Sequence, residues 1–206
     1  FLPGDEGHTY EERLICRMDS AISQEMLRHH IGERDESYYL YLIGIAAHVY
    51  ADTFSHFGFS GISSEYNSVD TQSIEFYELN ETMTNYIRGK AERFFQKYLS
   101  PNVENLEAAA AQAFSGSLGH AGVATHPDRP YLSWSFQHMH SGALAEKRDN
   151  RVNFLLACRS LHRFFYDVGT HIAPSSQNLG IAFDGIVAAV NDVLGLQGTM
   201  EERIQA

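Results

Sequence analysis

The amino-acid sequence predicts an all-α protein: a single-domain multi-helix bundle with a buried central helix at about 38–57. Apolar residues recur at helical spacing through most of the 206 residues. Capping-box patterns, which mark helix starts, begin at Thr9 and at Thr199. We find no alternation typical of strands, no internal repeat and no linker. We therefore expect one all-α domain over residues 1–206.

The first half is expected to hold two helices separated by a polar turn. Thr9 caps the first helix, whose apolar residues continue to about Arg28. The turn contains Gly32, and Ser37 is expected to cap the central helix. Gly58 follows the last apolar residues of this helix, and glycine commonly ends helices because it adopts a left-handed backbone conformation easily.

The second half is expected to add four helices and one long loop. We expect a long helix over 71–99 and a shorter one over 101–114, where proline suits the first turn. Residues 115–132 lack a helical period and contain several Gly and Pro, which predicts a loop. Apolar spacing resumes over 149–168 and again over 181–194, which predicts the last two long helices.

Charge and hydropathy limit the classes of partner. The formal net charge is −11, and we expect no stable nucleic-acid binding because that depends largely on Lys and Arg. The longest apolar run, Tyr38 to Tyr50, is too short for a transmembrane segment. No signal peptide is visible, which slightly favours a cytoplasmic location. Because the chain begins at Phe1, we expect it to be part of a longer chain lacking its N-terminal segment. The sequence does not indicate an oligomeric state.

The most informative feature is the run His48-x3-Asp52-x3-His56 in the expected central helix. Residues four apart on a helix lie on one side, so the three side chains form a stripe about 80° wide and ~12 Å long. Burying a carboxylate and two imidazoles is costly unless each is paired or binds a metal. The stripe therefore predicts either a metal site or a buried His–Asp–His network without metal.

In the metal interpretation, one ion cannot take both histidines of a straight helix, because metal–nitrogen bonds are only about 2.0–2.1 Å long. His48 and Asp52 can share an ion, and Asp52 can also orient the attacking water. His56 can bind a second ion or support the first. In the expected loop, near Asp128, His120 is the best candidate for a further ligand. We therefore predict one or two zinc or other divalent ions held by His48, Asp52, His56 and His120.

The segment AAHVYADTFSHFGFSG resembles the histidine–aspartate helix of the zinc-dependent phospholipase C / P1 nuclease superfamily, which is marked by H-x3-D followed by another histidine. It is more similar to an uncharacterised bacterial family with the motif H-x3-D-T-x2-H-x-G-F-S-G and a later loop like Gly119–Trp134. The resemblance implies an all-α, zinc-dependent phosphodiester hydrolase with His48 and Asp52 as ligands.

Together these observations predict a metal-dependent hydrolase of a small phosphate ester, a phospholipid or a nucleic acid. Asp52 is the expected catalytic residue, and the metal would lower the pKa of a bound water. The alternative is a non-catalytic helical protein with a structural metal site or a buried His/Asp network. The sequence leaves open whether the protein is an enzyme.

Overall fold

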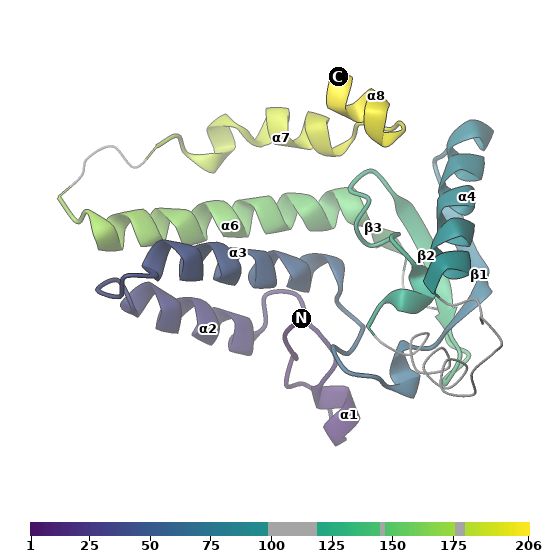
Figure 1. Cartoon of the computed structure of the whole chain (residues 1–206), viewed down its shortest axis with the longest axis horizontal. Coiled ribbons are helices and arrows are strands. Elements are labelled where there is room, and N and C mark those ends of the chain that lie inside the picture. Colours follow the sequence, from purple (N-terminus) through teal and green to yellow (C-terminus); the bar gives the residue numbers. More distant parts are fainter. Residues whose placement is uncertain (99–118, 145–146, 176–179) are drawn as a thin grey trace. The chain divides into compact units, whose positions relative to one another are not determined.

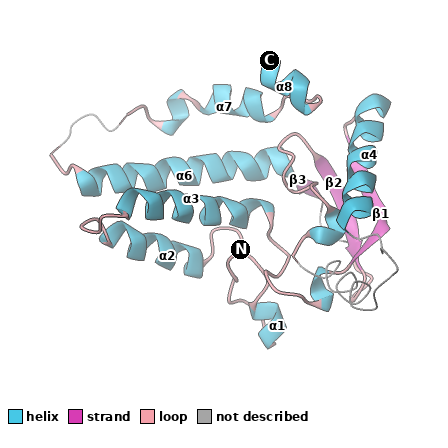
Figure 2. Cartoon of the chain, in the orientation of Figure 1, coloured by secondary structure: helices cyan, strands magenta, loops and turns pink. Residues whose placement is uncertain are grey.

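The computed structural model describes residues 1–98, 119–144, 147–175 and 180–206 (Figure 1). It contains helices and a three-stranded antiparallel sheet of order β1-β2-β3 (Figure 2). The fold is therefore mixed α/β, and the predicted all-α helical bundle is wrong.

The chain divides into two compact units. The helical unit comprises Phe1–Gly58 and Val152–Leu194, and the sheet unit comprises Phe59–Arg151 and Gly195–Ala206. None of the helices in the described ranges combines the length and the apolar character that crossing a membrane requires.

Three helices supply the core of the helical unit. Figure 1 shows α2, α3 and α6 side by side. Leu27 of α2, Ile43 and Phe54 of α3, and Phe164 and Val168 of α6 are buried together. The helices of this unit are α1 (Tyr10–Arg13), α2 (Ala21–Gly32), α3 (Tyr39–Ser55), α6 (Asn150–Ile172) and α7 (Val187–Leu194).

The first predicted helix is wrong as one continuous element. Asp19 has a left-handed backbone with φ of 52°, and Ser20 then begins α2 by accepting a hydrogen bond from the backbone N–H of Ser23 at 3.2 Å. The apolar residues Leu14, Ile15 and Met18 keep the helical period but lie between α1 and α2, so the pattern joined two helices that local capping separates. The capping box at Thr9 is confirmed.

The central helix is present as α3, but one side of it is exposed. Leu40, Tyr41 and Ile45 are 71%, 79% and 62% exposed, whereas Ile43 and Tyr50 are buried. A helix turns about 100° per residue, so these exposed positions lie within about 140° of one another, on the side away from the core. The prediction of a buried central helix is therefore wrong for this side of α3.

The sheet unit combines three strands with helices and short 3-10 turns. Phe76 of β1 lies opposite Trp134 of β2, which lies opposite Arg148 of β3. Trp134 and Ile87 of α4 are fully buried. The elements of this unit are η1 (Glu65–Asn67), β1 (Val69–Tyr77), α4 (Glu81–Tyr98), η2 (Ala121–Val123), β2 (Ser133–His138), β3 (Arg148–Asp149) and α8 (Met200–Gln205).

The predicted helix over 71–99 is wrong in its first part, where β1 lies. A register shift between Asp70 and Glu75 interrupts the strand pairing, which disrupts the alternation of side chains. Glu78 has a φ of 60° and ends the strand. Asn80 then starts α4 by accepting a hydrogen bond from the backbone N–H of Met83 at 2.8 Å.

Of the remaining predicted helices, one is confirmed, one is confirmed in part and one is not described by the structure. The helix expected over 149–168 is confirmed as α6, and the one over 181–194 is confirmed in its later part as α7. The capping box at Thr199 is also confirmed. The helix expected over 101–114 lies outside the described residues.

Candidate metal centre

His120 stands at the start of a compact loop of the sheet unit. The loop is a series of short turns, in which Val123 N–H donates to the His120 carbonyl at 2.9 Å and His126 N–H donates to the Val123 carbonyl at 3.2 Å. Ala124 has a φ of 50°, a left-handed conformation that is strained for a residue with a side chain. This conformation places the Ala124 carbonyl 2.9 Å from Nδ1 of His120.

The hydrogen bond to Ala124 fixes the chemistry of the His120 ring. A carbonyl oxygen only accepts, so Nδ1 of His120 carries the proton and donates it to Ala124. In the neutral ring, Nε2 then carries the lone pair, and this is the atom that can bind a metal. Histidine ligands of metals commonly have this second hydrogen bond, because it fixes the ring orientation and the tautomer.

Asn150, at the start of α6, holds the rest of the loop in place. Its side-chain amide donates to the carbonyls of His126 at 2.7 Å and Arg129 at 2.8 Å. Its side-chain oxygen accepts a hydrogen bond from the indole N–H of Trp134 at 3.1 Å. Asn150 is 3% exposed, so these bonds lie in an interior where their loss is costly.

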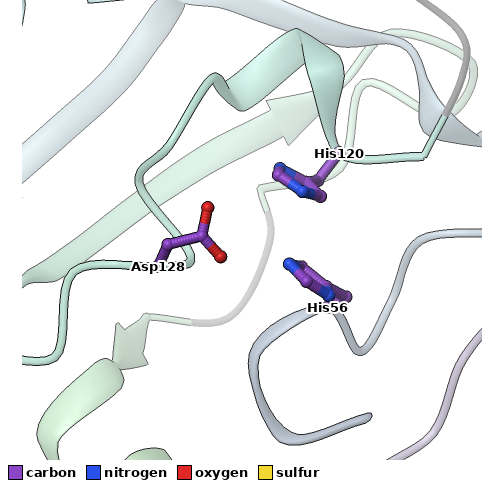
Figure 3. Close-up of side chains that lie close together, drawn as sticks. All are labelled: His56, His120 and Asp128. Atoms are coloured by element: carbon purple, nitrogen blue, oxygen red, sulfur yellow. The ribbon is translucent and has the colours of Figure 1, made fainter. Parts of the chain in front are cut away.

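Asp128 follows in the same loop and completes a group that could hold a metal ion. One ligand atom from each of His56, His120 and Asp128 lies within 4.8 Å of the others. Figure 3 shows the Asp128 carboxylate facing the two imidazole rings. His56 is buried, His120 half-buried and Asp128 exposed.

The spacing of this group is close to that of a metal site. Ligand atoms about 2.0–2.2 Å from one tetrahedral ion lie roughly 3.3–3.6 Å apart. The 4.8 Å limit therefore exceeds the bound spacing by about 1.2–1.5 Å. Two histidines and one carboxylate are a known ligand set of catalytic zinc, and they leave a coordination position for water.

His56 lies just beyond the end of α3, whose last residue is Ser55. Its ring stacks on Phe1 with centroids 4.9 Å apart. The Nδ1 atom of His56 is 3.9 Å from Oδ1 of Asp52, which is within ion-pair range but longer than a hydrogen bond. Asp52 thus lies beside the His56 ring, one turn earlier on the chain.

His48 differs sharply from its neighbours on the predicted stripe. The side chains of His48, Asp52 and His56 are 77%, 29% and 9% exposed. Nε2 of His48 is 3.8 Å from Oδ2 of Asp52. The stripe therefore runs from solvent to the interior, and the expectation that all of it faces inward is wrong. Metal binding by His48 and Asp52 stays a prediction.

His126 lies in the middle of the loop, but its ring packs against aromatic side chains. Its ring contacts Phe76 and Trp134 edge-on, with centroids 5.0 and 5.5 Å away. Burial, followed by the positive charge of Arg129, lowers the pKa of His126 to about 3. His126 is therefore neutral at pH 7 and belongs to the aromatic core of the sheet unit.

Sequence reasoning found His56 and His120 of this group and left Asp128 out. The signal for Asp128 was available, because a short loop rich in Gly and Pro brings residues eight apart close together. Without the turns of the loop, however, no periodicity connects positions 120 and 128.

Comparisons with known proteins place the chain in a family without naming an activity. A comparison with curated proteins found no match, and a comparison with solved structures found none. One family model, described as "Family of unknown function (DUF6765)", matches residues 1–206. The expectation of an uncharacterised family is thus confirmed, and the chain belongs to this family of unknown function.

Proposed function

We propose that the protein is a metal-dependent hydrolase of phosphate esters, with a zinc-type ion held by His56, His120 and Asp128. The observation that carries the proposal is this group of ligand atoms within 4.8 Å of one another. The His120 tautomer supports it, since the bond from Nδ1 to Ala124 leaves the Nε2 lone pair to act as the ligand atom. The resemblance of His48-x3-Asp52 to the phospholipase C / P1 nuclease superfamily suggests phosphodiester hydrolysis.

Each residue would have a distinct part in the chemistry. The ion would lower the pKa of a bound water and neutralise charge on the phosphoryl oxygens. His56 and His120 would bind through neutral imidazoles, and Asp128 would add one negative charge. Asp52, whose Oδ1 lies 3.9 Å from Nδ1 of His56, would stand beside that ring and help to orient the attacking water.

The proposal is tested by metal content and hydrolysis on the same preparations. Wild-type protein is loaded with zinc, dialysed, and assayed for bound zinc and for hydrolysis of bis(p-nitrophenyl) phosphate. We expect about one ion per chain. Exchanging His120 for Ala or Asp128 for Asn should lower hydrolysis by at least ~100-fold, because supporting residues alone already contribute 10–100-fold at metal sites. His29→Ala, an exposed histidine of α2, is the matched control.

His48→Ala separates the two possible ligand sets. If the ligands are His56, His120 and Asp128, His48→Ala keeps its zinc. If His48→Ala loses zinc and His120→Ala keeps it, the ion belongs to the stripe instead. Bound zinc without hydrolysis of phosphomonoesters, phosphodiesters or phospholipids would mean a structural metal and would contradict the hydrolase.

A further inference from the structure

We propose that the sheet unit contains a binding site for a phosphate-type anion, which holds a second anionic group of a small substrate. The site is a pocket of about 480 Å³ formed by α4, the loop around Arg129 and the start of α8. Only the assignment of the anion as a substrate group rests on the proposed function. The binding of the anion follows from the pocket itself.

The lining of this pocket is positively charged, whereas the whole chain is negatively charged. Its lining includes Lys90, Arg93, Arg129 and Arg203, with Asp128 as the single carboxylate. Four cations against one carboxylate give the lining a formal charge of +3, whereas the chain carries −11. An anion would be attracted to such a cluster and would offset the repulsion among its cations.

Two of the guanidinium groups are held in place by Tyr131, which is 7% exposed. Nη1 of Arg129 donates to the Tyr131 hydroxyl at 3.3 Å, and Nη2 donates to Oγ1 of Thr125 at 3.2 Å. The guanidinium carbon of Arg203 lies 5.0 Å from the centroid of the Tyr131 ring. One buried tyrosine, through its hydroxyl and its ring, therefore restrains both cations before any ligand binds, which reduces the entropy lost on binding.

Both arginines keep hydrogen-bonding capacity that the described residues do not use. Within the described part of the chain, the buried Nε atoms of Arg129 and Arg203 have no hydrogen-bond partner. No carboxylate forms an ion pair with either guanidinium there. Leaving such donors unsatisfied costs free energy. A guanidinium has five N–H donors, and the bonds to Tyr131 and Thr125 use only two of those of Arg129.

The donors and the size of the pocket indicate its ligand. Guanidinium groups bind phosphate with paired N–H donors, and Lys90 adds a mobile point charge. A pocket of this volume suits a small molecule and is too small for a nucleic-acid duplex. Asp128 lines the pocket and also belongs to the candidate metal group. A substrate with two phosphate-type groups could therefore place one in the pocket and the other at the metal.

The test measures anion binding to the protein without metal. Full-length protein in EDTA is titrated with inorganic pyrophosphate and, separately, with inorganic phosphate at constant ionic strength, using calorimetry. We expect pyrophosphate to bind with a Kd below about 1 mM. Arg129→Gln and Arg203→Gln should each weaken it by roughly 10–100-fold, the effect of losing a hydrogen bond to a charged group. Arg88→Gln, an exposed arginine on the same helix as Lys90 that does not line this pocket, is the matched control.

The outcomes distinguish this site from the metal site. His120→Ala should bind pyrophosphate as wild type does, so the anion site can stand even if no hydrolysis is found. Circular dichroism checks that each variant folds. If an arginine variant does not fold, Lys90→Gln, on the exposed edge of the pocket, is tested in its place. Wild type that fails to bind both anions, or equal weakening by Arg88→Gln, would overturn the proposal.

Discussion

The hydrophobic cores of the two units are formed by different kinds of side-chain contact. The helical unit packs apolar side chains of α2, α3 and α6 against one another. The sheet unit instead stacks Phe59 on Phe136 and Phe136 on Trp134, with centroids 5.6 and 5.1 Å apart. The buried guanidinium of Arg148 lies 5.2–5.6 Å from all three ring centroids.

The difference bears on the loop that carries His120 and Asp128 and on the anion pocket, which both belong to the sheet unit. Apolar packing is not directional, so it holds helices together without fixing the orientation of a polar group. Asn150 and the aromatic stack are directional, and they hold the loop that carries His120, Asp128 and Arg129. We therefore expect mutations in the helical core to change stability alone and mutations in the sheet core to change ligand binding as well.

Phe164→Ala in the helical core should have the largest effect on stability. Phe164 is 3% exposed within the core of α2, α3 and α6. Truncating a buried phenylalanine typically lowers the free energy of unfolding by about 3–5 kcal/mol. Urea unfolding measures the loss, and calorimetry on the folded variant should give the wild-type zinc affinity. A large loss of zinc affinity would show that the two cores do not have separate roles.

Asn150→Asp in the sheet core should lower both stability and metal affinity. The substitution replaces the amide that donates to the carbonyls of His126 and Arg129 by an oxygen that repels them. With two buried bonds lost, we expect the free energy of unfolding to fall by about 2–4 kcal/mol and zinc to bind at least tenfold more weakly. Asn85→Asp, at an exposed position of α4, controls for the added charge. An unchanged zinc affinity in Asn150→Asp would mean that Asn150 does not support the metal site.

Ser20→Ala tests the break between α1 and α2. Ser20 accepts a hydrogen bond from Ser23 N–H, and losing such a cap typically costs about 1 kcal/mol. Ser37→Ala is the comparison, because α3 begins after Tyr38 without a side-chain cap. Thermal unfolding should show a lower Tm for Ser20→Ala and a near wild-type Tm for Ser37→Ala. Equal shifts of Tm in the two variants would mean that the Ser20 cap of α2 contributes nothing to stability.

A further effect is expected on the pH dependence of stability. Burial first, and then the charges of His140 and Arg148, lower the pKa of His138 to about 4. The unfolded chain then binds more protons than the folded chain between about pH 6.5 and pH 4, so stability should fall as the pH drops through this window. His138→Phe should lessen the fall in urea unfolding at pH 7 and pH 5. An unchanged or steeper fall would contradict the assignment.

Local signals made part of the fold predictable. The capping boxes at Thr9 and Thr199 and the long apolar period of α6 depend on neighbouring residues, and each is confirmed. β2 also had a readable signal, since Trp134 and Phe136 alternate with serines, yet the helical pattern elsewhere obscured it. β1 was harder, because its register shift removes a regular alternation and its partner strand lies about 60 residues away.

The candidate site was predictable only in part. His56 and His120 could be chosen by residue type and by their motifs, and both belong to the group with Asp128. The roles of Asp128, Arg129 and Arg203 could not be predicted from the sequence. They depend on the turns of the loop and on the contact of both arginines with Tyr131. The exposure of His48 followed from which face of α3 meets the core, which helical spacing alone does not determine.

The central claim is that His120 and Asp128 bind one divalent ion together with His56. X-ray absorption at the zinc edge of the zinc-loaded protein tests it most directly. We predict a shell of nitrogen and oxygen at about 2.0–2.1 Å with the multiple-scattering signal of two imidazoles, reduced to one in His120→Ala. A spectrum with only oxygen ligands, or one that is identical in wild type and His120→Ala, would contradict the claim.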